Sequence, residues 1–274
     1  MQISGSTVLL TGATGGIGQA IARALHTRGA HLILTGRRVE VLDELAGELG
    51  RDEPGRDEGA DTRTLAVDLS DLGEVDRLVR ECGQVDILVA NAALPGSGRL
   101  ESFTMAEIDR ALAVNLRAPI ALAHALVPGM VERGRGHLLF MSSLSGKSAT
   151  PQTCIYNATK FGLRGFASGL RADLRDSGVG VSTVFPGFIR EAGMFANSGA
   201  QLPTGVGTRS PEDVARACID AIERNRAEVD VAPLPLRLGS AFSGLAPEFS
   251  ANVSRRLGAD RIAADLASGN ASKR

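Results

Sequence analysis

The chain has 274 residues, a length that suits one α/β domain with a sizeable buried core. Its 30 Lys and Arg residues balance 31 Asp and Glu residues, which excludes strong overall attraction to nucleic acid or an anionic membrane. Three cysteines without a Cys-x-x-Cys pair argue against a disulfide framework or zinc ribbon. The start lacks a secretory signal, and no stretch approaches about 18 uninterrupted apolar residues. We therefore expect a cytoplasmic protein without an integral membrane segment.

Short apolar runs alternate with longer stretches of helical periodicity, which is typical of repeated βα units around a parallel sheet. The runs predict strands over 7–10, 31–35, 62–67, 86–90, 137–141 and 178–184, with a weaker seventh over 228–231. The periodic stretches predict helices over 18–27, 39–49, 72–82, 105–132, 155–177 and 211–224. Ser210 and Pro211 suit the N-cap and first turn of the last of these helices. The expected fold is one doubly wound α/β domain with a mostly parallel sheet of about seven strands.

Three segments interrupt this alternation. Residues 51–61 are rich in charge, glycine and proline and indicate a surface connection. Residues 188–209 follow the sixth strand at the ligand-binding end of the sheet, which favours a substrate lid over a disordered insertion. Residues 232–274 form a C-terminal extension with helical periodicity near 249–266. This extension would suit covering the substrate entrance, packing on a neighbouring subunit or lying against a membrane.

A glycine-rich segment, Thr11-Gly12-Ala13-Thr14-Gly15-Gly16-Ile17-Gly18, joins the first predicted strand to the first predicted helix. Glycines let backbone N–H groups approach a pyrophosphate, and a helix N-terminus favours its negative charge. In this strand, turn and helix context the motif predicts a dinucleotide site of the Rossmann type.

The second predicted strand ends at Thr35-Gly36-Arg37-Arg38, where the adenosine ribose of a dinucleotide would lie. Sites for NAD normally place an acidic residue there to bind the ribose 2′-hydroxyl. Gly36 and the two arginines instead leave room and positive charge for a 2′-phosphate. The sequence thus favours NADP(H) over NAD(H); if both arginines are merely solvated, NAD is the alternative.

Tyr156 and Lys160 lie four residues apart on a predicted helix, so their side chains share one face. A free tyrosine titrates near ~10, but a neighbouring ammonium favours the phenolate and lowers that pKa. The pair is a candidate acid/base catalyst, although the spacing also fits a half-buried aromatic residue beside a solvated lysine.

Further motifs accompany this pair: Ser143 thirteen residues before Tyr156, the run Asn91-Ala92-Ala93, and Asn115. In order and spacing they resemble the short-chain dehydrogenase/reductase family over about residues 5–231. The glycine loop fits both the short and the extended forms of that family, whereas chain length and the Ser143 to Tyr156 spacing favour the short form. The resemblance implies an NAD(P)-dependent oxidoreductase that interconverts a carbonyl and a secondary alcohol by hydride transfer.

The resemblance also implies roles for individual residues. Ser143 would bind the substrate oxygen, Tyr156 would exchange the proton as general acid/base, and Lys160 would hold the nicotinamide ribose and lower the pKa of Tyr156. Asn115 would anchor a water in a proton relay, or alternatively cap local backbone. The thirteen-residue spacing selects Ser143 over Ser142 and Ser145. The implied cofactor contacts are Gly12, Thr14, Gly16, Ile17, Gly18, Arg37, Arg38, Asp68, Leu69, Asn91, Ala92, Tyr156, Lys160, Pro186, Gly187 and Ile189.

At several positions the expected role is shared with another, or the residue differs from the family pattern. Asp68 and Leu69 are expected at the adenine ring, and Asn91 fits a structural tie between strands as well as a cofactor contact. Ala93 replaces a family glycine. Glu191 replaces the threonine that would bind the nicotinamide amide and pyrophosphate, and a carboxylate there would repel phosphate.

The sequence contains no motif for serine hydrolysis, zinc-dependent hydrolysis or P-loop nucleotide binding. The chain has no Gly-x-Ser-x-Gly, no His-Glu-x-x-His and no Walker A lysine, and its four histidines lack ligand spacing, so no metal site is expected. Two alternative functions stay open: a nonenzymatic nucleotide-sensing regulator of the same fold, and a membrane-peripheral lipid or steroid reductase. The expected substrate is an apolar small-molecule carbonyl or alcohol, because the predicted lid contains apolar residues: Phe188, Ile189, Met194, Phe195 and Leu202. This lining does not distinguish steroid, acyl or small cyclic ketones. The family habit of pairing its fourth and fifth helices implies a dimer or a homotetramer.

Overall fold

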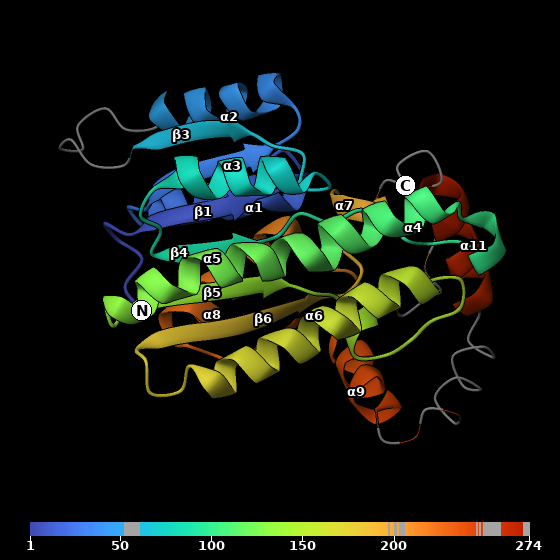
Figure 1. The fold of residues 1–274 in the computed structure, drawn as a ribbon. Helices are drawn as coiled ribbons and strands as arrows, with labels where there is room; N and C mark the ends of the chain where they lie inside the picture. The colour runs from blue at the N-terminus through green and yellow to red at the C-terminus, as the bar shows by residue number, and fades with distance from the viewer. Residues whose placement is uncertain are drawn as a thin grey trace.

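The computed structural model describes residues 1–51, 61–196, 198–199, 202, 206–244, 246, 248 and 259–270. A sheet of seven strands lies at its centre in the order β3-β2-β1-β4-β5-β6-β7 (Figure 1). All adjacent pairs are parallel. The strands are β1 (Thr7–Thr11), β2 (His31–Gly36), β3 (Thr62–Ala66), β4 (Ile87–Ala90), β5 (Gly136–Met141), β6 (Val179–Pro186) and β7 (Glu228–Val231). The strand order reverses between β1 and β4, which places the crevice for a ligand beyond the ends of these two strands.

Helices cover both faces of the sheet. The helices α1 (Gly16–Thr27), α2 (Val39–Arg51) and α8 (Pro211–Glu223) pack on one face. The opposite face carries α3 (Leu72–Cys82), α5 (Ala118–Glu132) and α6 (Cys154–Asp173). The fold is therefore the expected doubly wound α/β domain, with a sheet that is parallel throughout.

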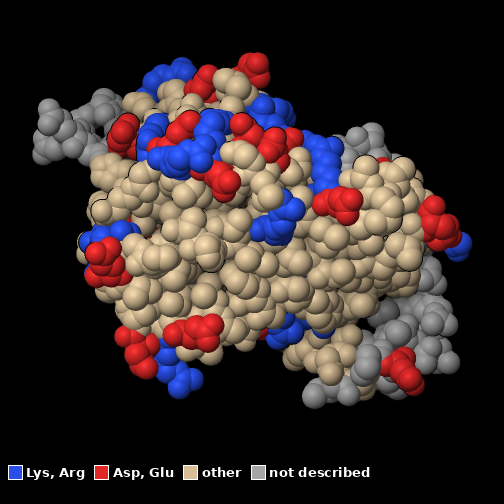
Figure 2. All heavy atoms as spheres, in the orientation of Figure 1, with Lys and Arg blue, Asp and Glu red and all other residues tan. Residues whose placement is uncertain are grey.

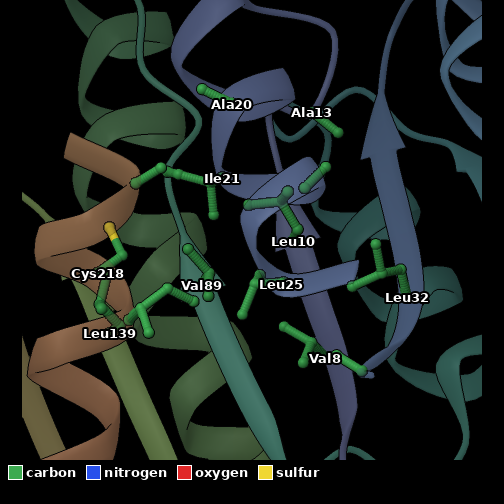
Figure 3. Close-up of a cluster of buried hydrophobic side chains, with 14 of the residues drawn as sticks. Val8, Leu10, Ala13, Ala20, Ile21, Leu25, Leu32, Val89, Leu139 and Cys218 are labelled. Carbon is green, nitrogen blue, oxygen red and sulfur yellow. The ribbon is translucent and has the colours of Figure 1, made fainter. Parts of the chain in front are cut away.

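Alternation along the strands divides the core into these two layers. In β1, Val8 and Leu10 point into the layer beneath α1, whereas Leu9 joins the layer beneath α3 and α5. Figure 3 shows Val8 and Leu10 packed with Ile21 and Leu25 of α1. Fully buried apolar strands of this kind are the reason why the sequence predicted them as continuous apolar runs.

Most predicted elements agree with the structure to within a few residues at each end. Ser210 caps α8 by accepting a hydrogen bond from the Asp213 N–H, and Pro211 occupies the first turn, as predicted. The predicted helix over 155–177 is wrong at its end, since α6 stops at Asp173. Residues 52–60 of the predicted surface connection and 249–258 of the predicted C-terminal periodicity lie outside the described residues.

The predicted continuous helix over 105–132 is interrupted. The structure has α4 (Met105–Leu112), one π-helical turn (Ala113–Arg117) and then α5. Three further helices were not predicted with these bounds: α7 (Gly193–Ala196), α9 (Leu234–Ser243) and α11 (Ala259–Asn270). In Figure 1, α9 extends away from the body, and α11 lies at the carboxyl end of the strands.

Among the described residues, one helix is long and apolar enough to cross a membrane by length and composition, the 28-residue stretch Met105–Glu132. Its α5 part packs on the sheet through Leu122, Ala123, Leu126 and Met130. A core helix of a doubly wound domain can have the same length and apolar composition, so packing against the sheet accounts for this stretch.

Candidate active site

The glycine loop between β1 and α1 adopts a shape that side chains would prevent. Gly12 has φ 69°, and a Cβ there would lie 2.8 Å from the Ala92 Cα. A Cβ at Gly18 would overlap the Gly12 carbonyl. The loop therefore packs on its own helix and on the segment after β4, and this leaves the backbone at Gly15 and Gly16 at the start of α1.

Asn91 and Thr11 hold this loop against β4. The Asn91 Nδ2 donates to the carbonyls of Thr11 at 3.1 Å and Gly12 at 3.2 Å. The Thr11 Oγ1 accepts from the N–H groups of Asn91 and Ala92, both at 3.1 Å. Asn91 thus ties the two strands together at the topological switch point, and it also lines the adjoining groove.

A groove of about 710 Å³ opens at the switch point. Eleven of the predicted cofactor residues line it: Gly12, Thr14, Gly16, Ile17, Gly18, Arg37, Arg38, Asp68, Leu69, Asn91 and Ala92. The groove runs from the ends of β2 and β3 to the segments that follow β4 and β6. Its volume and its glycine cradle suit an extended dinucleotide.

At the β2 end, the two arginines have different surroundings. Arg38 donates a hydrogen bond to the Thr14 carbonyl and so fastens the glycine loop. Arg37 is exposed and forms no hydrogen bond or ion pair with another described residue. Asp68 accepts hydrogen bonds from the Ser70 N–H at 2.9 Å and from its hydroxyl at 2.7 Å. Burial raises the pKa of Asp68, but these bonds and the charges of Arg37 and Arg110 outweigh it and hold the pKa below its usual value.

The predicted catalytic residues meet beyond the end of β5. Ser143 follows that strand, and its Oγ accepts a hydrogen bond from the Ser145 N–H at 3.1 Å. Tyr156 and Lys160 lie in the first turns of α6, with the Lys160 Nζ 5.5 Å from the centre of the tyrosine ring. The Lys160 ammonium is almost fully buried and donates to the Met141 carbonyl at 2.8 Å.

Burial dominates the titration of this pair. It raises the pKa of Tyr156 to about 12, against a smaller lowering by the hydrogen bond with Ser143. It lowers the pKa of Lys160 to about 7. Desolvation, which disfavours the charged forms of both groups, thus outweighs the lowering of the Tyr156 pKa expected from Lys160.

Asn115 occupies the π-helical turn and is 1% exposed. Its amide pairs with both backbone groups of Leu94: Oδ1 accepts from the N–H at 2.7 Å, and Nδ2 donates to the carbonyl at 2.9 Å. A longer contact of 3.5 Å reaches the Thr159 hydroxyl on α6. Asn115 thus connects the loop after β4 to the helix that carries Tyr156.

Five predicted cofactor residues are not among those lining the groove: Tyr156, Lys160, Pro186, Gly187 and Ile189. In the segment after β6, Ala192 lies against the glycine loop, with its Cβ 2.6 Å from where a Cβ on Gly16 would be. Glu191 has φ 67°, and its carboxylate pairs with Arg190 at 2.9 Å in an exposed position. Glu191 thus lines the groove, as the sequence suggested, but its carboxylate is exposed and pairs with Arg190, which does not line the groove.

The groove also contains residues that sequence reasoning missed. Arg110 and Val114 line it from the helix that carries Asn115. Their spacing of four residues places them on one helical face, a signal that counting back from Asn115 would have found. Ala192, Gly193, Met194 and Asn270 line it from α7, its preceding segment and the end of α11. No local pattern marks Asn270, because its position depends on the packing of α11 against α7.

Comparison with known proteins agrees with this geometry. The sequence profile described as short chain dehydrogenase matches residues 6–203. The chain belongs to the short-chain dehydrogenase family. It is accordingly an NAD(P)-dependent oxidoreductase acting on CH–OH groups.

Relatives in this short-chain dehydrogenase family match most of the chain. Dehydrogenase/reductase SDR family member 7B of Rattus norvegicus is 33% identical over 82% of this chain and 72% of its own length. Ketoacyl reductase HetN of a Nostoc species is 31% identical over 85% of this chain and 81% of its own length. A short-chain dehydrogenase from Sphingobium yanoikuyae, solved in complex with NADPH, superimposes with a TM-score of 0.76. It is 28% identical, and the match covers 91% of this chain and 95% of that one.

The residues of this short-chain dehydrogenase fit a nicotinamide dinucleotide. Added side chains would fill the backbone cradle at Gly12 and Gly18, and the groove continues from this cradle to Arg37 on one side and Leu94 on the other. The bound cofactor would supply or accept the hydride. The chain's own contribution is to orient that cofactor and to place the Ser143 and Tyr156 hydroxyls at the carboxyl end of the sheet.

Proposed function

We propose that this protein is an NADP(H)-preferring carbonyl reductase in which Tyr156 serves as general acid and Ser143 binds the substrate oxygen. The observation that carries the proposal is that Ser143, just after β5, and Tyr156, in the first turns of α6, come together at the carboxyl end of the sheet beside the buried Lys160, where burial raises the tyrosine pKa to about 12. A phenol with this pKa stays protonated at neutral pH. It is therefore ready to protonate the oxygen that becomes negative when hydride reaches a carbonyl carbon.

Lys160 would position this acid and hold the nicotinamide ribose. Asn115 would hold α6, the helix that carries Tyr156, in place against the loop after β4. The proposal that Asn115 anchors a relay water rests on its place between Leu94 and Thr159. Pro186, Gly187 and Ile189 would contact the nicotinamide from the segment after β6, once Ala192 moves away from Gly16.

The preference for NADP(H) is supported by the end of β2. Gly36 presents no carboxylate, and Arg37 is an exposed guanidinium beside the groove. Paired N–H donors of arginine suit a 2′-phosphate. The solved relative from Sphingobium yanoikuyae binds NADPH, which agrees with this preference.

An apolar substrate is supported by the segment after β6. Phe188 and Phe195 lie with ring centres 5.1 Å apart, and Ile189 of the same segment is buried in the core on the α1 face of the sheet. We propose residues 188–209 as the substrate lid, with the C-terminal extension at 232–274 packed beside it in a single domain. Relatives that include a ketoacyl reductase agree with a ketone substrate.

A substrate panel tests the proposal. Purified protein is assayed with NADPH and NADH against linear, cyclic and bulky ketones, and in reverse against the matching secondary alcohols. We expect ketone reduction with a kcat/KM at least tenfold higher for NADPH. A chain that binds NADPH yet turns over none of the panel would instead support a nucleotide-sensing regulator.

A second candidate, a membrane-peripheral reductase, is favoured by α9. Leu234, Leu238 and Phe242 recur every fourth residue and are 61%, 62% and 46% exposed. A stripe of this kind suits an interfacial helix. Flotation with phosphatidylcholine vesicles would decide: co-flotation lost in Leu238→Glu supports this candidate, whereas protein that stays at the bottom supports the cytoplasmic enzyme.

A further inference from the structure

The C-terminal helix α11 reaches the wall of the cofactor groove. It packs on α7 through small residues, since Ala263 and Ala267 are buried and a Cβ on Gly269 would lie 2.5 Å from the Ser198 Cα. This close approach brings its last residue, Asn270, into the groove lining beside Gly193 and Met194. Figure 1 shows α11 at the carboxyl end of the strands, where a bound cofactor would lie.

The Asn270 amide has one defined orientation. Its Nδ2 donates to the carbonyl of Met194 at 3.1 Å and to that of Leu266 at 2.9 Å. Both partners are acceptors, so the nitrogen must face them and the oxygen must point the other way. Among the described residues Oδ1 has no hydrogen-bond partner, although the side chain is only 1% exposed. A buried acceptor without a donor is unfavourable, and a ligand that supplies a donor removes this cost.

The position of Asn270 selects one half of the dinucleotide. Met194 belongs to the segment after β6, on the side of the sheet where β5 carries Ser143. The adenosine end lies across β1, at Arg37 and Asp68. The pyrophosphate between the two halves carries no donor for Oδ1. On the nicotinamide side, the donors are the ribose hydroxyls and the carboxamide N–H. The ribose is assigned above to Lys160, which does not line this groove, so the carboxamide N–H is the donor that fits Oδ1.

Glu191 strengthens this assignment. It lines the groove where the family threonine would bind the carboxamide, but its carboxylate is exposed and paired with Arg190. We propose that the Asn270 Oδ1 accepts a hydrogen bond from the nicotinamide carboxamide, so that α11 completes the cofactor site that Glu191 leaves open. The inference rests on the proposed function, because it requires a bound nicotinamide dinucleotide.

The test measures dissociation constants by isothermal titration calorimetry, without turnover. The ligands are NADP⁺ and its 3-acetylpyridine analogue, in which a methyl group replaces the carboxamide nitrogen. The proteins are the wild type, Asn270→Leu and the control Ser268→Ala, which alters an exposed side chain on the same turn of α11. Circular dichroism and melting temperature confirm that the variants are folded.

We expect Asn270→Leu to weaken NADP⁺ about tenfold, the effect of one neutral hydrogen bond, and Ser268→Ala to leave it unchanged. The wild type should bind the analogue about tenfold more weakly than NADP⁺, and Asn270→Leu should bind both ligands alike, because the two changes remove the same contact.

Three outcomes would overturn the inference. Equal affinity of wild type and Asn270→Leu for NADP⁺ would remove the contact and leave the proposed function intact. Equal weakening of both ligands in Asn270→Leu would show that the variant only loosens α7. A wild type that binds neither NADP⁺ nor NAD⁺ would overturn the proposed function as well.

Discussion

Burial of Tyr156 and Lys160 decides which proton is available at neutral pH. The pKa of Tyr156 rises to about 12 and that of Lys160 falls to about 7, so both groups are pushed towards their neutral forms. A neutral phenol donates a proton readily but accepts none. If Tyr156 is the general acid proposed above, the site in this form would favour reduction, whereas oxidation would first require the phenol to lose its proton.

This asymmetry predicts a pH dependence. Because the raised pKa lies above the assay range, kcat/KM for alcohol oxidation should rise about tenfold per pH unit between pH 7 and 10, as the phenolate fraction grows. Carbonyl reduction should change little in the same range. Initial rates in both directions measure this, with Tyr156→Phe as control, which should bind NADPH normally and lose most turnover both ways. An oxidation plateau near pH 7 would show that bound cofactor and Lys160 bring the tyrosine pKa down.

The two arginines after β2 predict a matched pair of variants. Arg37→Ala should weaken NADP(H) by one to two decades and leave NAD(H) almost unchanged, since only the 2′-phosphate loses a charge-assisted contact, worth about 1.5–3 kcal/mol. Arg38→Ala should weaken both cofactors by a similar factor, because Arg38 fastens the glycine loop through the Thr14 carbonyl. Dissociation constants for both cofactors measure this. Equal losses for both cofactors in Arg37→Ala would contradict the assignment.

At the scale of elements, Asn115 explains why the predicted helix over 105–132 is divided into α4 and α5 by a π-helical turn. The π-helical turn turns the Asn115 amide towards Leu94, and the pairing satisfies both Leu94 backbone groups. Asn115→Leu would leave those buried groups without partners. We expect a loss of about 2 kcal/mol in the free energy of unfolding. Arg117→Ala, an exposed change in the same turn, should alter it little. Urea denaturation of both variants provides the measurement, and unchanged stability in Asn115→Leu would show that the pairing contributes nothing.

The strands and main helices were predictable because apolar residues recur along the sequence at the spacing of the buried face of each element. The glycine loop and the Tyr156, Lys160 pair were predictable because their spacing is local as well. The π-helical turn was not, since it depends on the contact of Asn115 with a loop 21 residues away in sequence. Asn270 and α7 were missed for the same reason, as only the packing of α11 brings them to the groove. The charge states of Tyr156 and Lys160 also depended on desolvation that the sequence does not express.

At the scale of the molecule, charge is unevenly distributed. Figure 2 shows Lys, Arg, Asp and Glu gathered over the α2 and α3 end, and few of them on the face formed by α4, α5 and α6. Exposed apolar side chains lie on these helices, Met105 at 68%, Phe161 at 42% and Val131 at 40%. An apolar surface of this kind is typical of a subunit interface.

We therefore predict a homo-oligomer, a dimer or tetramer, assembled through this face. Phe161→Glu should lower the sedimentation mass at micromolar concentration towards that of a single 28.5 kDa chain, because it would bury a charge in an apolar contact. Val39→Glu, an equally exposed change on α2, should leave the assembly intact. A wild type that sediments as a monomer would contradict the prediction.

The contact of Ala192 with the glycine loop has a kinetic consequence. The methyl group lies against Gly16 at the start of α1, where a pyrophosphate would bind, so we expect the dinucleotide and this residue to compete for space. Entry of the cofactor would then require the segment after β6 to move away first, a unimolecular event whose rate does not depend on ligand concentration. Stopped-flow binding rates should level off at high NADPH. The same event would govern departure of the spent cofactor, which would make catalysis ordered, with the dinucleotide first to arrive and last to leave.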